Sequence, residues 1–248
     1  MNIIGDIGNT EVKICLIDKN FKIKKRVKIR SNEIKNIKIK NKLKFLLSNK
    51  KKIEYIIFSS VVPKIYQKFS FFFKKNFNKK VIEIKELNLK KLINVKVNKK
   101  QVGSDRLANS IAAIDNTNNY IIIDFGTATT FDVVIKRNYL GGIISHGINL
   151  SLKTLTAQAS LIPETNLKKI SYVIGKNTNE AVRSGFYWGY AGLIDNMIKL
   201  IKRQIKSSFK IILTGGLADL YKKSISAKCK VDKDLTIKGI IKITKNLI

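Results

Sequence analysis

The chain has 248 residues, of which 44% are hydrophobic, so it has enough apolar side chains for one large domain or two small lobes. No apolar run approaches the ~20 residues of a membrane span, and Asp6 and Glu11 come too early for a signal peptide. Cys15 and Cys229 lie far apart without a CxxC pair, which argues against a disulfide framework or a zinc site. We therefore expect a soluble cytoplasmic protein that does not bind membranes.

Basic residues dominate the charge, with 49 Lys and Arg against 17 Asp and Glu and a formal net charge of +32. Such an excess normally indicates a nucleic-acid partner. Here, however, the lysines are spread along the chain and alternate with Ile and Asn, as in residues 21–30 and 36–45. Ile, Lys and Asn share AT-rich codons, so drift in base composition explains the excess, and we expect no nucleic-acid binding.

The first half of the chain is predicted to alternate between strands and helices. Pro63 is expected to open a helix, and the phenylalanines that follow are expected to pack in the core. The expected strands cover residues 2–5, 12–17, 21–29, 55–63 with its turn, and 81–84, and the expected helices cover 42–48, 63–75 and 105–114, with Phe69, Phe71, Phe72 and Phe73 in the core.

The second half begins with a new strand near residue 120. The glycines at 185, 189 and 192 fall near one face of a long helical pattern and indicate close helix–helix packing. Strands are expected at residues 120–126 and 209–216, a hairpin over 129–145, helices at 150–159 and 177–205, and a closing element at 234–243.

A short pattern occurs twice, once in each half. Asp6 and Asp124 each end an apolar strand, each is followed two residues later by Gly, and small polar residues and a second alternating strand come next. The two copies are 118 residues apart (124 − 6), close to half the chain. This repeat predicts an α/β fold of two duplicated lobes, residues 1–117 and 118–248, with a cleft between them.

The repeated pattern suits phosphate binding. Glycine lets the backbone approach an oxyanion, N–H and hydroxyl groups donate to it, and the carboxylate holds a cation nearby. It is not a Walker A loop, because no GxxxxGK[ST] is present. A single copy would be read as a hairpin turn; two copies together with Thr-Gly-Gly at 214–216 favour a phosphate site.

Residues 103–106, Gly-Ser-Asp-Arg, open the next informative helix. Ser or Asp before an apolar helix is typical of a cap. Arg106 in the first turn opposes the helix dipole, which prefers acids there. An Arg beside an Asp at this place can instead bind a substrate carboxylate while Asp105 accepts a hydroxyl proton.

Taken in order, these motifs resemble type III pantothenate kinases over nearly the whole chain. That family belongs to the acetate and sugar kinase/Hsp70/actin superfamily, whose lobes are ribonuclease-H-like. The motifs are DIGNTEVK (6–13), SSVVP (59–63), GSDR (103–106), DFGTATTFDVV (124–134), GGII (141–144), GKNTNEAV (175–182), TGG (214–216) and DLTIKGI (234–240).

The resemblance implies a homodimeric kinase that uses ATP and Mg²⁺, with K⁺ or NH₄⁺, to convert pantothenate to 4'-phosphopantothenate, the first step of coenzyme A biosynthesis. It implies that Asp105 is the catalytic base and that Asp124 binds the monovalent cation. The implied ATP contacts are Asp6 (also near Mg²⁺), Ile7, Gly8, Asn9, Thr10, Glu11, Val12, Lys13 and Thr127, and the implied pantothenate contacts are Gly103, Ser104, Asp105, Arg106 and, across the dimer, Thr178.

Three positions depart from the family pattern. Lys96 stands where a substrate-contacting Tyr is usual, Asn98-Lys99 replaces Asn-Pro, and His146-Gly147 replaces Pro-Gly. His146 is the sole histidine, and without partners we interpret it as a turn substitution. Because the motif cores are intact, we still expect activity.

Two alternatives stay open at this point. Some members of the same family are described as accessory transcription factors, which predicts a clustered basic face and salt-sensitive DNA binding. An actin- or Hsp70-like ATPase switch is the other alternative, and it leaves the Gly-Ser-Asp-Arg motif without a role.

Overall fold

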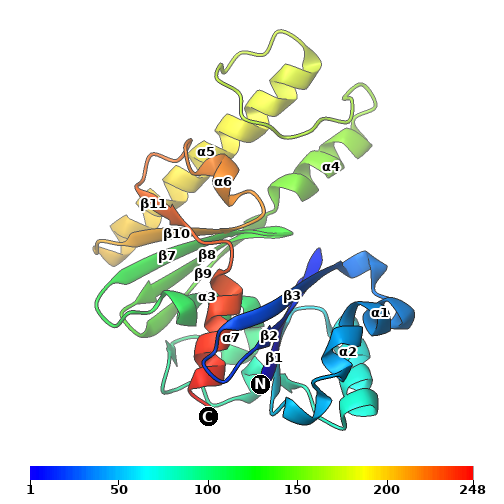
Figure 1. The fold of residues 1–248 in the computed structure, drawn as a ribbon. Coiled ribbons are helices and arrows are strands. Elements are labelled where there is room, and N and C mark those ends of the chain that lie inside the picture. Colours follow the sequence, from blue (N-terminus) through cyan, green and yellow to red (C-terminus); the bar gives the residue numbers. More distant parts are fainter. Residues whose placement is uncertain (248) are drawn as a thin grey trace. The chain divides into compact units, whose positions relative to one another are not determined.

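The computed structural model describes residues 1–247, apart from the side chains of residues 36–38. The chain divides into two compact units, each with its own sheet (Figure 1). The first consists of residues 1–113 together with the C-terminal segment from Asp234, and the second of Ile114–Lys233. Within the described residues, no helix combines the length and the apolar character needed to cross a membrane.

The first unit is built on a five-stranded sheet in the order β3-β2-β1-β4-β5. Strands β1 and β4 run parallel, as do β4 and β5, whereas β1, β2 and β3 form an antiparallel meander. Its elements are β1 (Asn2–Ile7), β2 (Glu11–Ile17), β3 (Ile23–Arg30), η1 (Ser31–Glu33), α1 (Asn36–Leu47), η2 (Lys50–Lys52), β4 (Ile56–Ser60), α2 (Pro63–Phe77), β5 (Ile82–Glu83), η3 (Ile84–Glu86), β6 (Asn94–Val95), η4 (Lys99–Gln101), α3 (Ser104–Ala113) and α7 (Leu235–Lys245).

Helix α2 covers this sheet with phenylalanine rings. Pro63 occupies the first turn, as expected for a residue without an N–H to donate, and Asn78 ends the helix in the left-handed region with φ 53°. Phe69 and Phe73 are fully buried and meet the ring of Phe58 on β4 edge-on at 5.8 Å. The prediction of core packing is thus confirmed for these rings and for the buried Phe72, and it is wrong for Phe71, which is 62% exposed.

The C-terminal helix α7 packs against α3 and so belongs to the first unit (Figure 1). The Thr236 hydroxyl donates to Oδ1 of Asn109 at 2.8 Å, and both residues are buried. At Gly239 the helices touch so closely that a Cβ atom would lie 1.9 Å from the carbonyl oxygen of Ala108. The expected division into residues 1–117 and 118–248 assigns α7 to the second lobe, whereas the structure places this helix in the first unit.

We expect Gly239→Val to destabilise the first unit, because the added side chain has to push α7 away from the backbone of α3. Overpacking of this kind costs about 1–3 kcal/mol or more in the free energy of unfolding. Denaturant unfolding followed by circular dichroism measures the loss. Lys245→Ala, an exposed change on the same helix, is the control; equal stability of the valine variant and the wild type would contradict the close contact.

The second unit has strands in the order β11-β10-β7-β8-β9. Strand β7 runs parallel to β10 and antiparallel to β8, which pairs with β9 in a hairpin. Its elements are β7 (Asn119–Phe125), β8 (Ala128–Ile135), β9 (Asn138–His146), α4 (Ile148–Gln158), α5 (Thr178–Ile205), β10 (Lys210–Gly215), α6 (Ala218–Tyr221) and β11 (Cys229–Val231).

The predicted duplication is visible in the two hairpins. In the first unit Asp6 stands one residue before the end of β1 and lies opposite Ser59 of the parallel strand β4. In the second unit Asp124 stands one residue before the end of β7, opposite Thr214 of the parallel strand β10. Each unit therefore delivers one carboxylate to the carboxyl edge of its sheet. The predicted α/β fold with two duplicated lobes is confirmed.

The prediction that the glycines of α5 pack closely against another helix is wrong for the described residues of this chain. A Cβ atom added at Gly185, Gly189 or Gly192 would meet no other described atom within 4 Å, so these glycines face open space. Their spacing correctly places them near one face of a helix, but no helix among the described residues packs there.

Candidate active site

The first unit forms a tight loop directly after Asp6. The Gly8 N–H donates to the carbonyl of Glu11 at 3.1 Å, which closes the turn between β1 and β2. Ser31 supports the loop from outside, because its hydroxyl donates to the Gly8 carbonyl at 2.7 Å and its N–H donates to the Thr10 carbonyl at 2.9 Å. The loop is thus held in one shape by backbone and Ser31 contacts.

The residues predicted to contact ATP differ in what they can offer. The side chains of Asn9 and Thr10 are exposed, and those of Asp6, Glu11 and Lys13 are half-buried. Ile7 and Val12 are fully buried members of the core, so only their backbone atoms can contact a ligand. This division suits a loop that binds phosphate through N–H and hydroxyl groups.

Helix α3 begins with the Gly-Ser-Asp-Arg motif. Oδ1 of Asp105 accepts the N–H of Arg106 at 2.8 Å. The same oxygen would lie 2.5 Å from a Cβ atom at Gly103, so only glycine leaves room for this carboxylate to fold back over the chain. Ser104 is 1% exposed and ties the helix start to the sheet, with its hydroxyl 3.2 Å from the Ser60 carbonyl.

Residues that follow β4 connect the two motifs. The Val61 N–H donates to the carbonyl of Ile7 at 3.1 Å. A methyl carbon of Val61 also lies 3.6 Å from the Cβ position of Gly103. The first unit therefore brings the loop after Asp6 and the start of α3 to the same edge of its sheet, as a phosphoryl donor and an acceptor hydroxyl require.

The Asp105 carboxyl group is suited to accept a proton. Burial raises its pKa above the ordinary aspartate value, while the Arg106 N–H and the charge of Arg106 oppose that rise. A raised pKa makes the carboxylate a stronger base, and it brings the group closer to the optimum for proton transfer near neutral pH.

The second unit places Asp124 beside a bare glycine. Gly215 has φ +86°, a conformation that favours glycine, and a Cβ atom there would lie 2.6 Å from both Oδ1 of Asp124 and the carbonyl oxygen of Phe125. The Gly216 N–H also donates to the Phe125 carbonyl at 3.1 Å. The Thr-Gly-Gly segment and the Asp-x-Gly loop thus meet and leave two oxygens around a space without a side chain.

The other predicted residues of the second unit lie at exposed ends of elements. Thr127 is exposed in the loop before β8, and its carbonyl would lie 1.9 Å from a Cβ atom at Gly147. Thr178 is the exposed first residue of α5, next to Asn177, whose side chain accepts the Glu180 N–H at 3.0 Å. Both threonines are accessible to a ligand.

His146 has a structural environment. Its ring Nδ1 contacts the Tyr190 hydroxyl and lies 3.0 Å from the Ser151 hydroxyl. The Tyr190 hydroxyl in turn donates to Ser151 at 2.9 Å. His146 is the last residue of β9 and joins that strand to α4 and α5, so the expectation of a turn residue without partners is wrong.

Three site residues were not identified from the sequence. Ser31 supports the loop after Asp6, and Glu83 contacts the hydroxyl of Ser104. The buried Ser59 lies opposite Asp6, and its hydroxyl has no hydrogen-bond partner among the described residues. Ser59 had a signal, because it belongs to the quoted SSVVP motif. The contacts that make Ser31 and Glu83 part of the site, with the loop after Asp6 and with Ser104, join residues distant in the chain and leave no local signal.

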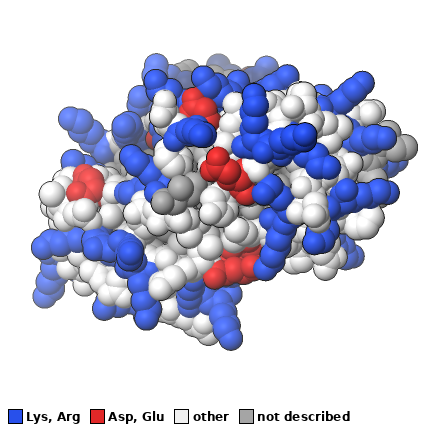
Figure 2. Space-filling view, turned by 60° about the horizontal axis from the view of Figure 1, so that its bottom comes forward, with Lys and Arg blue, Asp and Glu red and all other residues white. Residues whose placement is uncertain are grey.

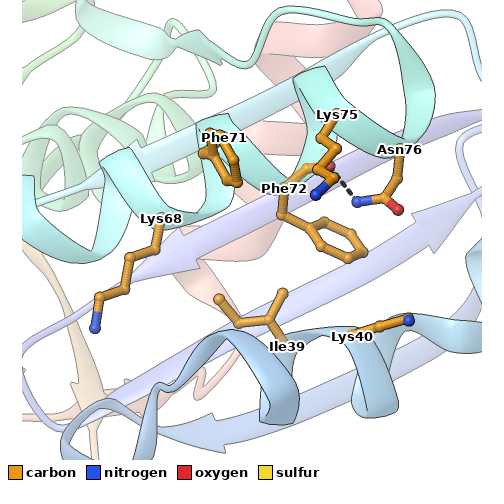
Figure 3. A pocket seen from close by; sticks show the side chains of 7 residues that line it. All are labelled: Ile39, Lys40, Lys68, Phe71, Phe72, Lys75 and Asn76. Carbon is orange, nitrogen blue, oxygen red and sulfur yellow. Dashed lines mark hydrogen bonds between the residues drawn. The ribbon is translucent and has the colours of Figure 1, made fainter.

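A separate cavity of about 210 Å³ opens between α1 and α2 (Figure 3). It contains none of the predicted site residues. The lining residues are Ile39, Lys40, Lys68, Phe71, Phe72, Lys75 and Asn76. Its lysines follow from a composition in which basic residues are common everywhere, so we assign it no ligand.

The basic residues are scattered on the face shown in Figure 2, where Lys and Arg side chains surround several acidic groups and form no single band. On this face, therefore, the basic side chains do not cluster as a nucleic-acid footprint would. Among residues 1–247, no group of three or more His, Cys, Asp and Glu side chains forms a metal centre.

Two sheets, each with an Asp-x-Gly hairpin, make up the α/β fold of this protein. Solved structures agree in fold: a Campylobacter jejuni protein named as a Baf family transcriptional activator matches with TM-score 0.63 at 20% identity over 99% and 98% of the two chains. A Sinorhizobium meliloti protein named as a 2-dehydro-3-deoxygalactonokinase matches with TM-score 0.62 at 7% identity over 100% and 99%. At such identities the likeness shows the fold alone.

Sequence comparisons are more specific. The family model of type III pantothenate kinase matches residues 2–200. The type III pantothenate kinase of Pelagibacter ubique strain HTCC1062 is 54% identical over 244 residues, which cover 98% of each chain. The chain belongs to the type III pantothenate kinase family.

Proposed function

We propose that this protein transfers the γ-phosphoryl group of ATP to the primary hydroxyl of pantothenate and so makes 4'-phosphopantothenate, the first intermediate toward coenzyme A. The observation that carries the proposal is the family match together with the shared sheet edge at which the loop after Asp6 and the Asp105 motif meet. Phosphoryl transfer needs positioning and charge neutralisation more than covalent chemistry, and these residues supply both.

In this reaction Asp105 accepts the proton of the attacking hydroxyl, and Arg106 binds the carboxylate of pantothenate. Backbone N–H groups of the loop after Asp6 and the exposed Asn9 and Thr10 side chains hold ATP phosphates. Asp6 would hold Mg²⁺, a cation that proteins commonly bind with one or two carboxylates plus substrate phosphates. When bound there, Mg²⁺ would neutralise charge on those phosphates.

We propose that the second unit binds a monovalent cation, K⁺ or NH₄⁺, and that Asp124 is one of its ligands. Hard cations take oxygen ligands, and Oδ1 of Asp124 and the Phe125 carbonyl both lie 2.6 Å from the Cβ position of Gly215. A side chain there would fill the space between these oxygens. Thr127 is proposed to contact ATP. A cytoplasmic location stays a prediction.

Product analysis tests the function. The purified protein, incubated with Mg-ATP, KCl and pantothenate, is expected to convert pantothenate to a species heavier by one phosphoryl group, identified by mass spectrometry. ADP formed without a phosphorylated product would point to the ATPase alternative. Duplex DNA bound tightly and with strong salt dependence would favour the regulator alternative, for which the scattered charge in Figure 2 gives no support.

We further propose that the protein is a homodimer formed through the second unit. In Figure 1, α4, the loop after it and the start of α5 project from the sheet of that unit. Leu161 is 91% and Ile174 is 85% exposed, and the Trp188 ring N–H donates to the Tyr172 carbonyl at 3.1 Å, so the loop follows α5. Exposed apolar surface of this kind marks interaction sites, and the unpacked glycine face of α5 permits a second helix to approach.

We expect Ile174→Asp to shift the protein from dimer to monomer, because a buried charge at the interface has no partner. Light scattering coupled to size-exclusion chromatography measures the mass. Lys169→Asp, an exposed change in the same loop, is the control. A wild-type monomer, or an unchanged mass for the aspartate variant, would contradict this interface.

A further inference from the structure

Glu83 lies beneath the start of α3, at the carboxyl end of the edge strand β5. It is half-buried, and its two carboxyl oxygens point to different partners. Oε2 accepts the N–H of Lys85 at 2.7 Å, which caps η3, and Oε1 contacts the hydroxyl of Ser104. The carboxyl group thus bridges β5, η3 and the first residue of α3.

Ser104 has little freedom to find another position. It is 1% exposed, and its hydroxyl reaches both Glu83 and the Ser60 carbonyl, the latter at 3.2 Å. These two partners stand at the ends of neighbouring strands β4 and β5. Since Asp105 and Arg106 follow directly, the direction in which they leave the sheet depends on this attachment.

Lysine side chains stiffen the segment that leads into α3. The Lys99 ammonium group donates to the carbonyls of Lys85 and Leu87 at 3.0 and 2.9 Å. The Lys85 ammonium group donates to the Lys100 carbonyl at 3.0 Å. Helices η3 and η4 are therefore cross-linked, and Ser104 follows the end of η4 by three residues.

The electrostatics of Glu83 agree with a functional role. Burial raises the pKa of its carboxyl group, while hydrogen bonds from Ser104 and Lys85 oppose the rise. The charged or titratable groups that act with it are Lys85 and Lys99, on η3 and η4, and Tyr66 on α2. A partly desolvated acid costs stability, and such residues are common at functional sites.

We propose that Glu83 is a positioning residue of this site: its carboxyl group holds the Ser104 hydroxyl and so sets the direction in which the first turn of α3 presents Asp105 and Arg106. The kinetic part of this inference rests on the proposed function of Asp105. The hydrogen-bonded attachment itself can be tested without activity.

Glu83→Ala tests both parts. We expect faster amide hydrogen exchange in the peptide covering residues 103–108, because the first turn loses its attachment. We also expect kcat/KM for pantothenate to fall about 10- to 100-fold, as misplaced catalytic groups do, with an unchanged KM for ATP. Glu83→Gln keeps the size: its carbonyl oxygen can accept the Lys85 N–H, and its NH2 group can donate to the Ser104 hydroxyl while that hydroxyl donates to the Ser60 carbonyl, so it is expected to restore both readouts. Glu86→Ala is the matched control, because Glu86 lies three residues further on, in an exposed ion pair with Lys80.

Ser104→Ala removes the same contact from the other side without adding volume. The double variant with Glu83→Ala is expected to lose no more kcat/KM than the worse single variant, because the two residues act through one contact. Losses of kcat/KM that add up in the double variant would overturn the proposal. It would also be overturned if the hydrogen exchange and the kinetics of Glu83→Ala stayed within about twofold of the wild type. If Glu83→Ala does not fold, Ser104→Ala takes its place, and the proposal is overturned if this variant has the same hydrogen exchange and the same kinetics as the wild type. If the wild type lacks pantothenate kinase activity, the proposed function fails, and the exchange result alone decides about Glu83.

Discussion

Asp105→Asn is expected to lower kcat by about 10²- to 10⁴-fold, the usual contribution of a general base. The amide keeps the size of the carboxylate but cannot accept the hydroxyl proton. Titration calorimetry is expected to show unchanged ATP binding, because the loop after Asp6, which we propose binds ATP, follows β1 and does not include this residue. In the wild type, turnover is expected to fall as the pH drops through the raised pKa of Asp105. The acid limb of the pH–rate profile therefore has its midpoint above the ordinary aspartate pKa of about 3.9.

Glu86→Gln removes an exposed carboxylate from the same unit and serves as the control for loss of charge. It is expected to keep wild-type kcat and the wild-type acid limb. Turnover retained in the Asp105 variant would remove this residue from the role of base. A loss of ATP binding in that variant would instead indicate that the substitution disturbs the whole sheet edge.

Asp124→Asn is expected to abolish activation by K⁺. In the wild type we expect faster turnover in KCl than in NaCl and a higher melting temperature with K⁺, since a ligand that binds the folded state stabilises it. The variant loses the anionic oxygen beside Gly215, and its turnover in KCl is expected to fall at least ~10-fold, as when a ligand shell is disturbed. Its melting temperature is expected to be the same in both salts.

Asp219→Asn is the control, because Asp219 lies on α6 in an exposed ion pair with Lys233. It is expected to respond to K⁺ as the wild type does. A K⁺ response that survives in Asp124→Asn, in both turnover and melting temperature, would show that the cation binds elsewhere.

Much of the fold was predictable because its signals are local. The apolar strands before Asp6 and Asp124, each followed by Asp-x-Gly and a second strand, predicted a duplicated unit that the structure confirms, and the hairpin predicted over 129–145 is formed by β8 and β9. Pro63 marked the start of α2 correctly. The start of α3 was also predicted to within one residue, since Ser104 and Asp105 are typical of a helix beginning.

What the sequence could not predict depends on contacts between distant residues. Helix α7 has an apolar face that fits many partners, and its packing on α3 becomes visible only in the folded chain, in the Thr236–Asn109 hydrogen bond and the close contact at Gly239. Glu83 reaches Ser104 across 21 residues of chain, so no spacing pattern connects them. The glycine face of α5 predicted a packing partner that the described chain does not contain, because a pattern cannot tell a neighbouring helix from a second copy.

The most direct test of the account is ATP consumption by the folded protein with and without pantothenate, each in KCl and in NaCl. We predict ADP formation that depends on pantothenate, is faster in KCl, and matches the amount of phosphorylated pantothenate formed. ADP formation that is absent, or unaffected by pantothenate, in protein shown to be folded and dimeric would contradict the assignment as a pantothenate kinase.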